Sequence, residues 1–159
     1  MNRFDPESLM RAAIAQARAG IAAGQSPFGC AIARAGELIA EAHNMVWATT
    51  DITAHAEIVA LRRACQKTGR IHLEGAVVAT TCEPCPMCMA ALHWAQVDTV
   101  YYGALIDDAT RSGFNELHIP ASDMVRLGRS RVELVSDVLS AECKALFQEW
   151  RQTGDAREY

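Results

Sequence analysis

A chain of 159 residues has the usual size of one folded domain, and its 50% hydrophobic and 21% charged residues are typical of a soluble globular protein. The formal net charge is −4 and no basic stripe is present, so the sequence does not favour a polyanion partner such as tRNA or DNA. No apolar run approaches the length that crosses a bilayer, so we expect no membrane partner.

The first part of the chain predicts one helix and a pair of strands. Residues 6–23 form the expected helix, because apolar side chains recur there every three or four positions: Met10, Ile14, Ala17 and Ile21. Residues 28–33 and 38–43 read as strands, and Ala35-Gly36 between them predicts a hairpin turn.

Helices and strands alternate along the rest of the chain. After a loop over 44–52 we expect a helix over 53–67, a strand over 76–81, a helix over 86–96, a strand over 100–103, a loop, a more exposed strand over 131–134, and a last helix from 140. The two middle strands are almost wholly apolar, as central strands covered on both faces are. This order predicts a single α/β domain over 1–159, folded as a three-layer α/β/α sandwich around one mixed sheet.

The six cysteines are expected in a reducing compartment. The start of the chain, residues 1–6, is polar, and Arg11 and Arg18 interrupt the apolar stretch after it, so we expect no export signal and a cytoplasmic protein. Clustered cysteines then indicate metal binding or catalysis rather than disulfides. The three isolated ones are expected to be small buried side chains: Cys30, Cys65 and Cys143.

Two short segments carry the chemistry, and each begins a predicted helix. Cys85 and Cys88 are one helical turn apart, at a helix start where unpaired N–H groups lower a thiol pKa. His55 adds a nitrogen from the other helix start, and one His with two Cys leaves one tetrahedral zinc position open for water. Glu57 lies beside these ligands and can act as the general base, as in the H-x-E and P-C-x-x-C pattern of zinc deaminases.

Other readings of these cysteines are a redox pair, half of a closed four-cysteine zinc site, or part of an iron–sulfur run that begins at Cys82. No second Cys-x-x-Cys follows, and the run lacks its fourth cysteine, so both metal alternatives lack ligands. We expect Cys82 to end its strand as a buried residue.

Residues 27–102 resemble the cytidine deaminase-like superfamily, in the branch that holds bacterial guanine deaminases and tRNA adenosine deaminases. Thr53-Ala54-His55-Ala56-Glu57 and Cys82-Glu83-Pro84-Cys85-Pro86-Met87-Cys88 carry the resemblance. It implies a mixed sheet of five strands, zinc held across two helix starts, hydrolytic deamination, and a homodimer.

The resemblance also implies roles for residues outside these motifs. Gly113-Phe114-Asn115-Glu116 is similar to a segment of guanine deaminases whose second acidic residue assists proton transfer, which puts Glu116 in that role, although Asn115 stands where Asp is common. Asn44 matches the residue whose amide binds the base. Tyr159 is similar to an aromatic residue of a segment, here about 140–159, that is exchanged between subunits and closes the partner's pocket.

Each of these residues also has an ordinary structural reading. Glu116 could be solvated, Asn44 could serve a turn, and Tyr159 could be disordered. Phe28 and Trp94 could form a stacking wall for a planar ring or belong to the core.

Guanine is the leading substrate, converted to xanthine and ammonia, with Glu57 moving protons to the ring nitrogen and the leaving amine. The alternatives are a tRNA adenosine deaminase, a deaminase of a nucleoside, cytosine or a triazine, and a zinc module without catalysis.

Overall fold

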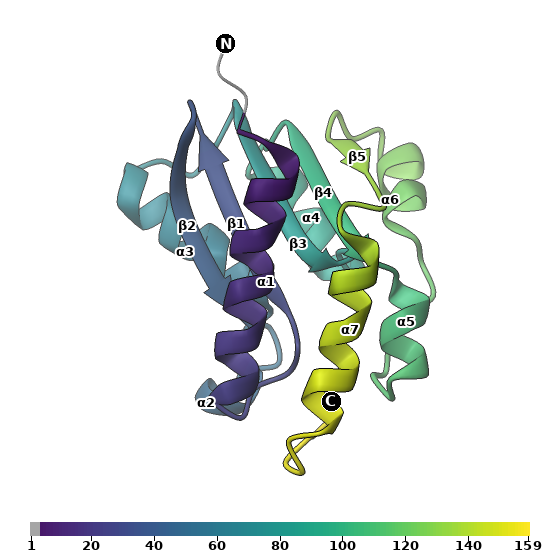
Figure 1. The fold of residues 1–159 in the computed structure, drawn as a ribbon. Coiled ribbons are helices and arrows are strands. Elements are labelled where there is room, and N and C mark those ends of the chain that lie inside the picture. Colours follow the sequence, from purple (N-terminus) through teal and green to yellow (C-terminus); the bar gives the residue numbers. More distant parts are fainter. Residues whose placement is uncertain (1–3) are drawn as a thin grey trace.

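A mixed sheet of five strands forms the middle layer of the computed structural model, which describes residues 4–159 (Figure 1). In sheet order the strands are β2 (Glu37–His43), β1 (Gly29–Arg34), β3 (Ala76–Cys82), β4 (Thr99–Ala104) and β5 (Glu133–Val135). β1 is antiparallel to β2 and β3, whereas β3, β4 and β5 are parallel. The predicted mixed five-stranded sheet is therefore confirmed, and the first three residues of the polar start lie outside the described residues.

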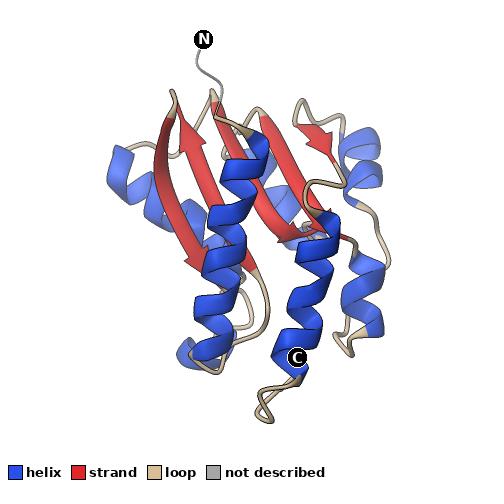
Figure 2. Ribbon diagram, viewed as in Figure 1, coloured by secondary structure: helices blue, strands red, loops and turns tan. Residues whose placement is uncertain are grey.

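Helices cover both faces of this sheet (Figure 2). α1 (Pro6–Ala22) and α7 (Ser140–Arg151) lie on one face, and α3 (Ala56–Thr68) and α4 (Pro86–Trp94) lie on the other. On the first face α1 and α7 are also joined by two exposed ion pairs, Arg11–Glu142 at 3.2 Å and Arg18–Glu149 at 2.9 Å. The predicted α/β/α sandwich is confirmed.

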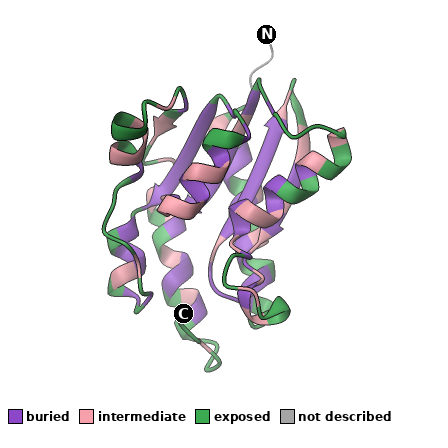
Figure 3. Cartoon of the chain, turned by 180° about the vertical axis from the view of Figure 1, so that it is seen from behind, coloured by how far each residue is buried: buried purple, intermediate pink, exposed green. Residues whose placement is uncertain are grey.

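The core lies in two clusters, one on each face of the sheet. Successive residues of β3 contribute to opposite clusters: Val78 packs under α3 and α4, and Ala79 packs under α1 and α7. β4 is buried along its whole length, whereas β5 at the edge is only partly buried, as its sequence pattern predicts. Figure 3 shows the buried strands between helices whose outer faces are exposed.

The β1–β2 hairpin turns at Ala35 and Gly36, as predicted. Both residues have positive φ, 52° and 80°, the conformation that tight hairpins with right-handed twist require. β2 is an edge strand, and two side chains of α3 donate hydrogen bonds to its backbone. Arg63 Nη1 donates to the carbonyl oxygen of Glu41 at 2.6 Å, and Lys67 Nζ donates to that of Leu38 at 3.3 Å.

Three short helices were not predicted: α2 (Val46–Thr49), α5 (Ile106–Arg111) and α6 (Ala121–Gly128). α2 and α5, with four and six residues, are too short for a clear apolar period. α6 has one apolar side, but its eight residues are fewer than the window over which a helical period is recognised. No helix within residues 4–159 combines the length and apolar character needed to cross a membrane.

Three boundaries differ from expectation by two or more residues, and one cysteine differs in its burial. β5 begins at Glu133 rather than residue 131. α3 begins at Ala56 rather than residue 53, because His55 is still extended at ψ 156°. α4 ends at Trp94, just before Gln96 takes a positive φ of 57°. Cys30 and Cys143 are buried as expected, but Cys65 is partly exposed.

Candidate metal centre and active site

The carboxyl ends of three strands lie at the same end of the sheet. β2, β3 and β4 run in the same direction, because β1 is antiparallel to both β2 and β3 and β4 is parallel to β3. Asn44 follows β2, the cysteine motif follows β3, and α5 follows β4. Phe28, just before β1, lies at the same end of the sheet, and its carbonyl accepts the N–H of Asn44 at 3.0 Å. Open α/β sheets place their ligand sites at the carboxyl ends of their strands.

Two helix starts bring the predicted metal ligands together. His55 is the residue before α3, and Cys85 is the residue before α4; both are extended. Cys88 lies in the first turn of α4 and is fully buried. Because both helices lie on the same face of the sheet, the three ligand atoms lie within 4.8 Å of one another.

The spacing of these atoms fits one tetrahedral zinc ion. His55 Nδ1 lies 3.6 Å from the Sγ atoms of both Cys85 and Cys88. Zinc bonds of about 2.0 Å to nitrogen and about 2.3 Å to sulfur, at tetrahedral angles, separate the two ligand atoms by about 3.5 Å. The donor set of one imidazole and two sulfurs therefore fits zinc and leaves a fourth position free.

The two thiols have different proton affinities. A hydrogen bond from Cys88 lowers the pKa of Cys85 to about 4, against the effect of burial and with further help from His55. The same hydrogen bond and burial raise the pKa of Cys88 well above its ordinary value. Zinc requires both sulfurs as thiolates, so its binding releases a proton from this pair.

Glu57 lies beside the ligands and is not one of them. Its side chain is buried, and Oε1 accepts a hydrogen bond from Thr80 Oγ1 at 2.8 Å. Oε2 accepts the Sγ–H of Cys88 at 3.4 Å. Burial raises the pKa of Glu57, and the Cys85 thiolate adds to this effect. A carboxylate with a raised pKa next to a metal site can accept and return a proton.

A small cavity of about 20 Å³ opens onto these groups. It brings together most of the residues singled out from the sequence, around the ligands His55 and Cys85: Phe28, Asn44, Glu57, Glu116 and Tyr159. Burial, followed by the Cys85 thiolate, raises the pKa of Glu116 to about 7. The cavity has room for about one water molecule.

Tyr159 fills the space next to the metal ligands. Its hydroxyl accepts a hydrogen bond from Asn44 Nδ2 at 2.7 Å, and its ring centroid lies 5.5 Å from that of His55. The other side of the ring meets Phe114 edge-on at 5.3 Å. Asn44 is fully buried, and its Oδ1 accepts the N–H of Val46 at 3.1 Å, which fixes the amide so that Nδ2 points at Tyr159.

Residues 157–159 are held in this place by three further contacts. The indole N–H of Trp47 donates to the carbonyl of Arg157 at 3.1 Å, and the Arg157 guanidinium lies 4.4 Å from the Trp47 ring centroid. The backbone N–H of Asn115 donates to the carbonyl of Tyr159 at 3.2 Å.

Phe28 packs against the core and also lies at the cavity, whereas its role as a stacking wall for a planar ring stays a prediction. It lines the cavity, and it packs edge-on against two core rings, Phe114 at 4.9 Å and Phe147 at 5.8 Å.

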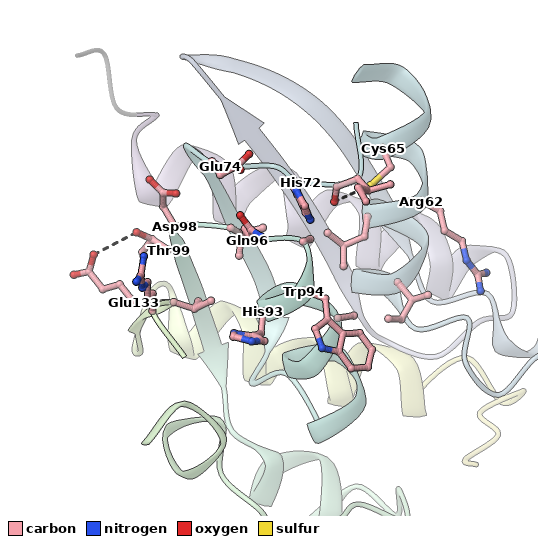
Figure 4. A pocket seen from close by; sticks show the side chains of 18 of the residues that line it. Arg62, Cys65, His72, Glu74, His93, Trp94, Gln96, Asp98, Thr99 and Glu133 are labelled. Atoms are coloured by element: carbon pink, nitrogen blue, oxygen red, sulfur yellow. Dashed lines mark hydrogen bonds between the residues drawn. The ribbon is translucent and has the colours of Figure 1, made fainter. Parts of the chain in front are cut away.

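The expectation for Trp94 is wrong in its placement. Trp94 is the last residue of α4, whose start holds the ligands, so about 13 Å of helix separates it from Cys85. Its side chain is 71% exposed and lines a separate groove of about 1240 Å³, with Ile71 and His93 (Figure 4). His93 is also exposed there and pairs with Ser130 Oγ at 2.9 Å.

Three residues at the site were not singled out from the sequence. Thr80 holds Glu57, Trp47 holds residues 157–159, and Glu83 lines the cavity. Glu83 stands inside the cysteine motif, which was a signal in the sequence, whereas nothing local marks Thr80 or Trp47. Cys82 ends β3 as a buried residue, as expected.

Comparisons with known proteins agree with this geometry. The model of the cytidine and deoxycytidylate deaminase zinc-binding region matches residues 4–104. Guanine deaminase of Bacillus subtilis (strain 168) is 36% identical over 154 residues, covering 96% of this chain and 98% of that protein. A tRNA-specific adenosine deaminase of Aquifex aeolicus (strain VF5) is 34% identical over 145 residues, covering 88% and 95%. The solved structure of a guanine deaminase from Nitrosomonas europaea has a TM-score of 0.86 at 30% identity, covering 94% of this chain and 86% of that one.

Proposed function

Because the chain belongs to the cytidine and deoxycytidylate deaminase zinc-binding family and is a zinc-dependent hydrolytic deaminase, we propose that it converts free guanine to xanthine and ammonia. The observation that carries the proposal is the cavity, where the amide of Asn44 and the carboxyl groups of Glu57 and Glu116 surround the metal ligands. The Nδ2 group of Asn44 can donate to the edge of a base, and the two carboxyl groups can move protons. The similarity to guanine deaminases over nearly the whole chain supports guanine in particular.

The residues divide the chemistry between them. His55, Cys85 and Cys88 would hold zinc, which when bound supplies a Lewis acid that lowers the pKa of water. Glu57, buried and with a raised pKa, takes a proton from the attacking water and passes it to the ring nitrogen next to C2. Glu116, with a pKa of about 7, assists the second proton step, in which the amine leaves as ammonia.

Residues 157–159 close the pocket in this proposal. A cavity of about 20 Å³ does not admit a bicyclic base, so Tyr159 has to withdraw before guanine enters. Its withdrawal frees Asn44 Nδ2, which then binds the base in place of the tyrosine hydroxyl. The return of the segment shields the pocket from bulk solvent while the one attacking water stays inside.

A homodimer in the cytoplasm is part of the proposal. Ile71 and Trp94, 76% and 71% exposed, lie at the groove of Figure 4 and support this face as the contact with a second copy. Exchange of residues 140–159 between the copies stays a prediction. It is tested by mixing a chain that lacks 156–159 with a Glu57→Ala chain: exchange brings the intact segment onto the intact site and restores activity, and closure within each chain does not.

A tRNA adenosine deaminase is the second candidate, supported by the 34% identity to such an enzyme over 88% of the chain. The two functions differ in their dependence on salt, because binding of a polyanion weakens steeply as salt rises. The net charge of −4 favours the small-molecule substrate.

The test is a screen of ammonia release from guanine, guanosine, adenosine, cytosine and ammeline, with and without a zinc chelator. We expect guanine to react fastest, the chelator to abolish the reaction, and added salt to change it little. Faster release from another compound of the panel, or deamination of tRNA that falls steeply with salt, would overturn guanine as the substrate.

A further inference from the structure

Glu83 connects the metal-binding turn to both ends of a distant segment. It lies between Cys82 and Cys85, and its backbone N–H donates to the carbonyl of Ala104 at 2.8 Å. Its side chain accepts two backbone N–H groups, that of Ile106 on Oε2 at 3.1 Å and that of Ala121 on Oε1 at 2.8 Å. Ile106 and Ala121 are the first residues of α5 and α6, where a helix has N–H groups without a partner of its own.

The segment between these two residues, 106–121, carries Glu116. Residues 112–120 form neither helix nor strand. Their first half is anchored by Phe114, which is buried and stacks on Trp150 at 5.1 Å, and by Arg151, which donates to the carbonyl of Ser112 at 2.6 Å. The second half is exposed from residue 117 to 120, and the Glu83–Ala121 bond holds its far end.

We propose that Glu83 is a positioning residue, whose carboxylate fixes the loop of Glu116 at a set distance from the metal ligands. The inference rests on the proposed proton-transfer role of Glu116. One carboxylate accepts both hydrogen bonds and ties both helix starts to the turn that also carries Cys85, so a shift of the loop relative to the metal ligands breaks at least one of them. Charge-assisted hydrogen bonds of this kind are among the stronger ones in proteins.

Glu83→Gln is the informative substitution because it keeps the shape of the side chain. The amide has one acceptor oxygen, and its NH₂ group faces an N–H donor, so one of the two bonds is lost. Glu83→Asp is a second variant, which keeps the charge but is one methylene shorter. Glu37→Gln on the exposed start of β2 is the matched control, outside the site and without a recorded ion pair in the described chain.

The first measurement needs no substrate. Hydrogen exchange of the amides of Ile106 and Ala121 is compared between the wild type, Glu83→Gln and Glu37→Gln, with zinc content measured on the same samples. We expect one zinc per chain in all three and faster exchange across 106–121 only in Glu83→Gln. Unchanged exchange in a zinc-loaded Glu83→Gln protein would refute the positioning role, whatever the substrate proves to be.

The second measurement is a double-mutant cycle with Glu116→Gln, run on whichever amine the screen identifies. If Glu83 acts through the loop, Glu83→Gln lowers kcat/KM by about tenfold in the wild type and by less than about twofold when Glu116 is already Gln. We expect Glu83→Asp to behave in the same way with a smaller loss. Equal losses in both backgrounds would show a general structural effect and overturn the proposal.

Discussion

Glu57, the proposed general base, is the residue whose loss is expected to separate zinc binding from catalysis most clearly. Glu57→Gln keeps the size of the side chain and removes no metal ligand, so zinc should stay bound. Its amide cannot take a proton from water, so kcat should fall by about 10²–10⁴-fold. Metal analysis and ammonia release check both points, and Glu37→Gln is the control. A Glu57→Gln enzyme with near-wild-type kcat would contradict the assignment.

The carboxyl group of Glu116 predicts a pH dependence near neutrality. Burial raises its pKa from 4.5 to about 7, and a group that gives a proton to the leaving amine acts in its protonated form. The rate should therefore decrease as the pH rises through about 7, and Glu116→Gln should lack this decrease. The sign for stability is the same: the folded protein binds this proton more tightly than the unfolded chain, so the contribution is complete below about 4.5 and is lost as the pH rises through about 7. A pH–rate profile that is the same in both proteins would exclude the role.

At the residue scale the sequence predicts best what local spacing determines. His55, Cys85, Cys88 and Glu57 each lie in the first turn of a helix or next to it, so two short motifs fix the metal site. Trp94 lies on one of the same helices, and the predicted helix over 86–96 already places it about 13 Å from the ligands at the helix start, so the sequence itself argues against Trp94 as a wall of the site.

The sequence does not reveal hydrogen bonds between residues that lie far apart along the chain. The side chain of Glu83 binds backbone 23 and 38 residues away, and that of Trp47 binds backbone 110 residues away. The roles of Asn44, Phe28, Glu116 and Tyr159 stay predictions, although all four line the cavity.

At the scale of elements, residues 157–159 are predicted to open and close over the cavity. Trp47→Ala removes the indole hydrogen bond to Arg157 and the contact of the guanidinium with the ring. Together these losses should shift the closed-to-open ratio by about tenfold. Hydrogen exchange of the last residues should become faster, while zinc content stays the same. Trp47→Phe keeps a ring for Arg157 and should give a smaller change. Equal exchange in the wild type, Trp47→Ala and Trp47→Phe would show that Trp47 does not hold residues 157–159 closed.

Helices and strands can be predicted from the sequence where the periodic spacing of apolar residues extends over enough residues to be recognised. The long helices and the central strands appear in the sequence as apolar stripes or runs, whereas α5 has no such stripe and that of α6 covers only eight residues. Tertiary contacts decide these short helices, since Glu83 accepts the first N–H of each one and their apolar residues pack at the edge of the core. Their position could not be predicted without the fold.

For the whole molecule, zinc is expected to contribute to stability as well as to chemistry. An ion that binds only the folded chain at about 1,000 times its Kd stabilises by about 4 kcal/mol, which corresponds to a Tm shift of about 10 °C at this size. A chelator should lower Tm by this amount in the wild type. Cys88→Ser should start with the low Tm and show no further loss. Cys65→Ser, at a partly exposed cysteine outside the ligand group, should respond like the wild type. If the chelator did not change the Tm of the wild type, this would contradict a zinc site in the folded protein.

The two borders of the sheet limit how copies of this molecule can meet. β5 has only three residues, and along β2 the side chains of Arg63 and Lys67 already bind backbone oxygens that an incoming strand would need. Growth of the sheet from molecule to molecule, the first step towards fibrils, is therefore obstructed on both sides. Along β2, two cationic side chains that take no part in the chemistry of the site therefore also hinder aggregation in crowded solutions of this protein.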